Sequence, residues 1–160
     1  MPADAGFFDV ATHVTKAEVE VAGTVEEVWA VLNDHPSWTE WFPGMSSVTA
    51  QPNVWTAAGD TRQVKVNFLP VSEQAIIVEP NVDLAFTILK WPLPIAKRAA
   101  ERMQLVDTSR NGESYVNVIY TGAFELRMNG RISWPLMKGQ LASAWAKAFE
   151  NLPDAIAKRS

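Results

Sequence analysis

Few residues of this sequence could do chemistry, and one arginine stands out among them. In the segment DTRQVKVNF the hydrophobicity alternates, so Arg62 shares one strand face with Val64 and Val66. A guanidinium that faces an apolar interior requires a partner. Arg62 therefore either anchors a carboxylate or phenolate of a ligand or forms a structural ion pair, with Glu79 or Asp107 as its candidate partners.

Recognisable catalytic signatures are absent. The sequence has no G-x-S-x-G nucleophile elbow, no Gly-rich phosphate-binding loop and no cluster of two histidines and a carboxylate with metal-ligand spacing. An enzyme that folds a reactive chain in a shaped cavity needs less, because one general acid or base can suffice. The candidates for that role are Arg62, Asp107, Tyr115, Asn117, Tyr120 and Thr121. His35 suits either a general base or a helix end whose ring bonds nearby backbone, and we favour the second.

Composition restricts the class of protein. The 160 residues include no cysteine and two histidines, so we expect no zinc or iron centre and no cofactor. The N-terminus lacks the pattern of a secretory signal, and no run of about 18 apolar residues occurs, which predicts a cytoplasmic protein. The net charge is −4, and the basic residues form no dense stripe, so we expect no nucleic-acid partner.

The longest helical pattern is the C-terminal stretch WPLMKGQLASAWAKAFENLPDAIAKR. Its apolar residues recur at three- and four-residue spacing, which predicts one long amphipathic helix. Pro153 lies inside this pattern, so we expect a break near Asn151–Asp154. Towards the other end of the chain, Thr24 opens a T-x-x-E capping box, which predicts a helix that ends near Asn33.

Alternating hydrophobicity predicts a sheet between these two helices. A short helix is expected at Ser37–Trp41, and strand patterns with short connections follow it. The expected strands are Thr12–Val21, Ser46–Gln51, Asp60–Phe68, Ser72–Glu79, Asp83–Lys90, Glu101–Thr108 and Ser114–Glu125. No repeat or linker divides the chain, so we predict a single domain over residues 1–160, in which residues 1–11 could be flexible.

This order of elements, together with the segment VAGTVEEVWAVLNDHPSWTEWFPGMSSV, resembles the START-like (SRPBCC) superfamily, in particular its bacterial polyketide cyclase/dehydrase-type branch. The resemblance covers about Thr12 to Lys158. It implies an α+β helix-grip fold, in which a curved seven-stranded antiparallel sheet wraps around a long C-terminal helix and two short helices follow strand 1. It also implies a cavity between sheet and helix. One scaffold of this kind hosts many functions, so the function requires evidence of its own.

One end of the sheet is expected to form the mouth of that cavity, because the connections of an antiparallel meander alternate between two ends. The segments at this end are the turn Phe42–Met45, a turn at Leu69–Val71, the segment Trp91–Ala100 and the stretch MNGRISWPLM that precedes the last helix. They carry many large apolar side chains, which surface loops rarely do. The alternative is that these side chains close the core without binding anything.

Strand parity adds interior positions to those at the mouth. The predicted ligand-binding residues are Trp41, Phe42, Met45, Arg62, Val66, Phe68, Phe86, Ile88, Trp91, Ile95, Met103, Tyr120, Phe124, Met128, Trp134, Met137 and Leu141. This lining predicts a carrier or sensor that binds a hydrophobic small molecule such as a lipid, an isoprenoid or an aromatic polyketide. Two alternatives remain open: an enzyme of the polyketide cyclase, aromatase or dehydratase type, and a toxin-like protein-interaction role.

The basic residues near the expected mouth suggest one further partner. Lys90, Lys97, Arg98 and Arg102 flank apolar side chains of the Trp91–Ala100 segment. Cations beside apolar groups favour contact with an anionic membrane surface, so transient contact through Trp91–Arg102 is expected. The alternative is a loop that is simply solvated.

Overall fold

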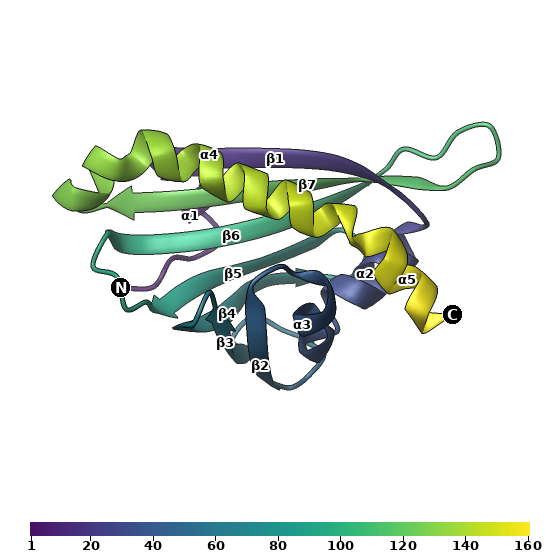
Figure 1. Ribbon diagram of the computed structural model, residues 1–160, viewed down its shortest axis with the longest axis horizontal. Helices are drawn as coiled ribbons and strands as arrows, with labels where there is room; N and C mark the ends of the chain where they lie inside the picture. Colours follow the sequence, from purple (N-terminus) through teal and green to yellow (C-terminus); the bar gives the residue numbers. More distant parts are fainter.

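The computed structural model describes residues 1–160 and confirms the expected α+β architecture (Figure 1). One antiparallel sheet has the strand order β1-β7-β6-β5-β4-β3-β2. Its strands are β1 (His13–Ala22), β2 (Met45–Gln51), β3 (Thr61–Val66), β4 (Leu69–Glu79), β5 (Asp83–Lys90), β6 (Ala96–Asp107) and β7 (Tyr115–Leu126). The helices are α1 (Phe7–Val10), α2 (Val25–Leu32), the 3-10 helix η1 (His35–Ser37), α3 (Trp38–Trp41), α4 (Met128–Glu150) and α5 (Leu152–Arg159).

The core lies between the sheet and the C-terminal helices. Figure 1 shows α4 running along the sheet beside β1 and β7, while α5 meets α2 at the other end of the molecule. Trp145 and Phe149 of α4 are buried in one cluster with Val118 and Tyr120 of β7. Burying a large apolar side chain stabilises the fold by roughly 1.5–3 kcal/mol, so this cluster holds α4 against the sheet.

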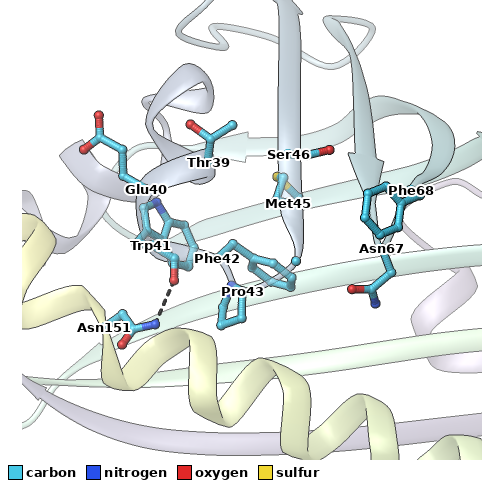
Figure 2. A pocket seen from close by; sticks show the side chains of 11 residues that line it. Thr39, Glu40, Trp41, Phe42, Pro43, Met45, Ser46, Asn67, Phe68 and Asn151 are labelled. Carbon is cyan, nitrogen blue, oxygen red and sulfur yellow. Dashed lines mark hydrogen bonds between the residues drawn. The ribbon is translucent and has the colours of Figure 1, made fainter.

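Two local signals of the sequence are confirmed at the helix ends. The Thr24 backbone N–H donates to Glu27 Oε2 at 2.8 Å, and Thr24 Oγ1 accepts from the Glu27 backbone N–H at 3.1 Å. The expected break near Pro153 is also present, because α4 ends at Glu150 and α5 starts at Leu152. Between them, Asn151 Nδ2 donates to the carbonyl of Trp41 at 2.9 Å, which ties the break to α3 (Figure 2).

The start of α4 differs from the expectation. The stretch MNGRISWPLM was expected to lead into the last helix, whose pattern began at Trp134, but all of it forms the first turns of α4 even though Pro135 lies within it. Tertiary contact explains the difference. The Arg127 backbone N–H donates to the Ile95 carbonyl at 2.9 Å, and a Cβ added at Gly130 would lie 2.2 Å from that same oxygen. Because Gly130 has no side chain, the β5–β6 connection can contact the first turn of α4 closely and hold it in place.

The turn between β3 and β4 was also predicted wrongly. It was expected at Leu69–Val71, but Val66 pairs with Leu69, so the turn consists of Asn67 and Phe68. Both residues have positive φ, 49° and 68°, which is the backbone of a tight hairpin turn. Phe68 was expected inside, yet its side chain is 90% exposed.

The corrected turn changes the partner of Arg62. A turn centred on Pro70 would place Arg62 opposite Val78, next to the expected partner Glu79. The observed register places Arg62 opposite Glu73.

Two further segments contain more structure than their sequences predicted. Strand β6 begins at Ala96 rather than Glu101, which shortens the expected loop after Trp91. At the N-terminus, Ala3 and Phe7 are buried on the outer face of the sheet, and the Ala3 backbone N–H donates to Thr87 Oγ1 at 3.0 Å. Residues 1–11 thus have a defined contact surface on the sheet.

Candidate functional site

A cavity of about 250 Å³ lies between α4 and the sheet. Sixteen residues line it, and eleven of them are hydrophobic, so its walls are mainly apolar. These residues are Trp38, Phe42, Pro43, Met45, Arg62, Val66, Asn67, Leu69, Val71, Glu73, Ile88, Trp91, Glu101, Leu141, Ala144 and Trp145. Pro43 and Asn67 are exposed while Arg62, Glu73 and Glu101 are buried, which distinguishes an open end from a closed end.

The predicted site residues divide into two groups. Those that line the cavity are Phe42, Met45, Arg62, Val66, Ile88, Trp91 and Leu141. Those that do not are Trp41, Phe68, Phe86, Ile95, Met103, Tyr120, Phe124, Met128, Trp134 and Met137. Strand parity and the expected mouth thus selected residues around this cavity, neighbours of its lining as well as the lining itself.

The ten residues outside the lining have identifiable places. Phe86, Met103, Tyr120 and Phe124 are fully buried in the core, so parity gave their direction correctly but not their access to the cavity. Met128 is 73% exposed on α4. The ring centroids of Trp134 and Phe124 are 5.5 Å apart, and Met137 Sδ accepts a hydrogen bond from Ser133 Oγ. Ile95 is half-buried. Trp41 is buried, and its Nε1 has no hydrogen-bond partner in the protein.

Figure 2 shows the outer side of the mouth. A second hollow of about 410 Å³, open to solvent, lies there between Phe42, Pro43 and the β3–β4 turn. Phe68 lies at this turn and Asn151 at the opposite side of the hollow.

The closed end of the cavity holds a buried ion pair. Arg62 Nε contacts Glu73 Oε2, and both side chains are almost fully inaccessible. The guanidinium carbon also lies 4.0 Å from the ring centroid of Trp38 and 4.7 Å from that of Phe86, which are cation–π distances. Trp38 is completely buried in the site.

His35 completes the surroundings of Arg62. Arg62 Nη1 lies 2.9 Å from His35 Nδ1, and because a guanidinium can only donate, Nδ1 must accept. The ring proton is then on Nε2, which donates to Asn33 Oδ1 at 3.2 Å. Burial, assisted by the charge of Arg62, lowers the pKa of His35 to about 2. His35 is thus a neutral acceptor that bonds two side chains instead of the backbone groups expected.

Glu101 is a second buried acid of the site. Tyr120 Oη donates to Glu101 Oε1 at 3.1 Å, and both residues are buried. Burial, together with the nearby charge of Glu73, raises the pKa of Glu101 to about 8. Burial also raises the pKa of Tyr120 well above its usual value. At neutral pH this pair is therefore a carboxylic acid beside an uncharged phenol.

Gly122 makes room for that pair. The β6–β7 register places Gly122 opposite Glu101. A Cβ at position 122 would lie 2.4 Å from Tyr120 Oη, which is closer than atoms approach one another. The missing side chain therefore allows the Tyr120 hydroxyl to reach Glu101.

Sequence reasoning missed both Glu73 and Glu101. Parity could have found Glu101, because it lies two residues before the inward-facing Met103. Glu73 required the correct β3–β4 register. Of the other acid–base candidates, Asp107, Tyr115 and Asn117 bond Ser109, Glu113 and Glu18 away from the cavity, and Thr121 does not line it.

The structure also describes what the chain could hold. No group of three or more His, Cys, Asp or Glu side chains is arranged to bind a metal ion. None of the helices combines the length and apolarity needed to cross a membrane.

Other proteins of known structure have the same arrangement of sheet and helix. The sheet that grips a long C-terminal helix around a cavity is the START-like helix-grip fold, and three solved structures share it. These are the Zhui aromatase/cyclase from Streptomyces sp. R1128 (TM-score 0.71, 14% identity, 92% of this chain and 94% of that one), a START superfamily protein from Mycobacterium smegmatis (0.68, 14%, 92% and 99%) and truncated norcoclaurine synthase from Thalictrum flavum (0.65, 16%, 87% and 91%). At these identities the likeness shows the fold alone.

Residues 12–157 match the family described as polyketide cyclase/dehydrase and lipid transport, so the chain belongs to that family. No curated protein sequence is similar enough to refine this assignment.

Proposed function

We propose that this protein binds a small hydrophobic molecule in the cavity between α4 and the sheet and acts as a carrier or sensor. The observation that carries the proposal is the combination of apolar walls with a buried polar cluster at the closed end. Pockets for small molecules have this composition, because apolar walls supply affinity and a few polar groups fix orientation. Membership in a family that includes lipid transport supports the same conclusion.

The size of the cavity limits the ligand. A volume of about 250 Å³ equals that of about eight waters in the liquid, since each occupies about 30 Å³. A ligand, or the inserted part of one, would therefore have roughly eight to twelve heavy atoms. Two fused rings or a short isoprenoid chain meet this limit.

The charges at the closed end limit the ligand further. The positive charge of Arg62 is already balanced by Glu73, and Glu101 keeps its proton at neutral pH. An anionic head group would find no free cation there and would meet Glu73 at close range. A neutral oxygen, such as that of a ketone or phenol, could accept from the Glu101 acid instead. We therefore favour a neutral ligand over the carboxylate anchored by Arg62 that the sequence suggested.

The first experiment is native mass spectrometry of protein purified without detergent, followed by solvent extraction of any adduct. A set of probes with one carbon skeleton then tests the chemistry: 2-tetralone, 2-naphthoate and naphthalene, titrated against the fluorescence of Trp38 and Trp145 in the cavity wall. We expect 2-tetralone to bind most tightly. Tighter binding of 2-naphthoate would contradict the neutral-ligand proposal, and no binding of any probe or lipid would contradict a ligand-binding role.

Two variants of α4 provide the structural control. Leu141→Trp fills the cavity from its wall and should abolish binding, because Leu141 lines the cavity. Gln140→Trp adds the same bulk at an exposed neighbouring position and should leave binding unchanged. Equal effects of the two variants would place the ligand elsewhere.

A second candidate function is a cyclase-type enzyme, and the state of Glu101 favours it. A general acid works best when its pKa lies near the working pH, and Glu101 has a pKa of about 8. The protonated carboxyl could give its proton to the carbonyl oxygen of a bound polyketone while a water molecule takes the proton of the adjacent carbon, which forms the enol; that proton returned through water would restore the Glu101 acid. Glu101→Gln should then keep ligand binding but lose product formation. Unchanged turnover in this variant would exclude Glu101 as the acid.

A further inference from the structure

The end of the molecule at which the cavity opens carries an exposed apolar stripe. Met128, Ile132 and Leu136 of α4 are 73%, 79% and 67% exposed, and their four-residue spacing places them on one helix face. Leu89 and Leu93, at the end of β5 and in the β5–β6 connection, are 43% and 42% exposed. In Figure 1 the start of α4 and the end of β5 lie at the same end of the sheet. Apolar side chains gathered in this way mark an interaction surface.

The segments that carry this stripe are strongly basic. Residues 88–100 and 126–149 contain seven of the fourteen Lys and Arg residues and no Asp or Glu. Their formal charge is +7, whereas the rest of the chain carries −11. This separation of charge is pronounced for a protein whose net charge is −4.

Most of these cations form no ion pair within the chain. Only Lys97 and Arg98 are paired within the chain, at 3.8 Å and 2.7 Å from Glu125. The cations without an ion pair are Lys90, Arg127, Arg131 and Lys138 in this part of the molecule, and Lys147 in the last turn of α4. The electrostatic field at this end of the molecule is therefore largely uncompensated.

A surface hollow brings the cations and the apolar groups together. It measures about 740 Å³ and includes Lys90, Lys97, Arg98 and Arg127 but no carboxylate. Leu93 lies in the same lining. An anionic head group could enter this hollow while the neighbouring apolar side chains contact the chain attached to it.

We infer that this surface, formed by residues 88–100 and the first half of α4, docks on the head-group region of an anionic lipid bilayer. Aliphatic side chains inserted at the acyl boundary, with Lys and Arg beside the phosphates, are the recognised composition of such a contact. The contact is peripheral, because no helix is able to span a membrane. Trp91 lines both this surface hollow and the cavity, so a docked molecule presents the cavity to the bilayer.

The surface differs from the segment expected from sequence. Arg102 does not belong to it, because its guanidinium donates to Asp83 and lies over the ring of Phe8. The apolar side chains of MNGRISWPLM were expected at the mouth of the cavity, but their arrangement on one face of α4 was not, since the helical pattern was expected to begin at Trp134. Nucleic acid is the other polyanion to consider, but exposed aliphatic side chains contribute nothing to phosphate contacts.

Vesicle sedimentation of the full chain tests this inference without any cavity ligand, so its outcome is independent of the proposed function. We expect binding to phosphatidylcholine vesicles that contain about one third phosphatidylglycerol, little binding to pure phosphatidylcholine, and weakening by salt. Arg127→Gln/Arg131→Gln should weaken partitioning about 25-fold, since each cation contributes about fivefold. Lys16→Gln/Lys158→Gln makes the same charge change at exposed positions of β1 and α5 and should have little effect.

A second pair of variants tests the apolar stripe. Ile132→Gln/Leu136→Gln should reduce binding while the melting temperature stays unchanged, because both side chains are exposed. Val10→Gln/Val106→Gln alters exposed apolar residues elsewhere and is the control. The inference is overturned if anionic vesicles are not bound, if the stripe variants bind like their controls, or if the surface binds duplex DNA but not vesicles.

Discussion

Replacing Glu101 by glutamine should change how the stability of this protein depends on pH. Glutamine keeps the shape of a protonated carboxyl but cannot ionise. In the folded protein the pKa of Glu101 is about 8, compared with 4.5 ordinarily, so between these values the folded state holds a proton that the unfolded state has released. The stabilisation is full below pH 4.5 and is lost as the pH rises to about 8.

His35 has the opposite dependence, which defines the useful range of pH. Its pKa is lowered from 6.5 to about 2, so its stabilisation is full above pH 6.5 and is lost as the pH falls. The two contributions oppose each other between pH 4.5 and 6.5. Burial also raises the pKa of Glu73, which acts in the same direction as Glu101. Above pH 6.5 His35 no longer opposes Glu101, so the wild type should lose stability up to about pH 8 and Glu101→Gln should lose less.

The size of the effect follows from the difference in proton affinity. Its upper limit is about 5 kcal/mol, and because electrostatic effects in proteins correspond to a high effective dielectric constant, we expect about 2–4 kcal/mol. Urea unfolding of the wild type and Glu101→Gln at about pH 5, 6.5 and 8.5 measures it. The free energy of unfolding of the variant should rise relative to the wild type as the pH increases.

A matched control and a direct readout complete this test. Glu40→Gln, at an exposed position of α3, should not change the pH dependence. Infrared spectroscopy should detect a protonated carboxyl in the wild type at neutral pH that is missing from Glu101→Gln. If the stability difference between wild type and Glu101→Gln is constant from about pH 5 to 8.5, Glu101 ionises normally and the description of the closed end is wrong.

Three further substitutions test separate features. Arg62→Met leaves the Glu73 carboxylate buried without a partner and should destabilise the fold by about 3–5 kcal/mol in urea unfolding. The double variant Arg62→Met/Glu73→Leu should recover most of that loss. If it does not, Arg62 stabilises the fold through packing rather than through the ion pair. Phe68→Gly should raise stability by roughly 0.5–1 kcal/mol in thermal unfolding, because glycine adopts a positive φ without steric cost; a loss would show that the exposed ring makes favourable contacts. Thr24→Ala removes the α2 cap and should cost about 1 kcal/mol, and an unchanged melting temperature would argue against the capping box.

The fold was predictable because its signals are local. The capping box at Thr24, the break at Pro153 and the strand Asp83–Lys90 each depend on a few adjacent residues, and the structure confirms all three. The resemblance carried by these elements therefore led to the correct architecture. Contacts between distant segments could not be predicted from the sequence in this way. At the start of α4, for example, the close contact between Gly130 and the Ile95 carbonyl outweighs the unfavourable effect of Pro135 on the helix.

The site was less predictable because it depends on register. The sequence of the β3–β4 turn favours Leu69–Val71, since proline is common in turns, whereas the observed turn has a bulky residue, Phe68, at a positive φ. With the turn misplaced, the candidate partners of Arg62 were Glu79 and Asp107, and Glu73 was not identified. Parity is more robust than register, and it placed Arg62, Val66 and Ile88 towards the cavity they line.

The hydrogen bonds of His35 have a consequence for the shape of the cavity. One continuous segment, residues 33–45, reaches the closed end through His35, forms the wall through Trp38 and borders the opening through Phe42 and Met45. One segment, which contains η1 and α3, therefore extends from the closed end of the cavity to its opening. Insertions or deletions within this segment are a direct route by which relatives with the same sheet could acquire cavities of different depth.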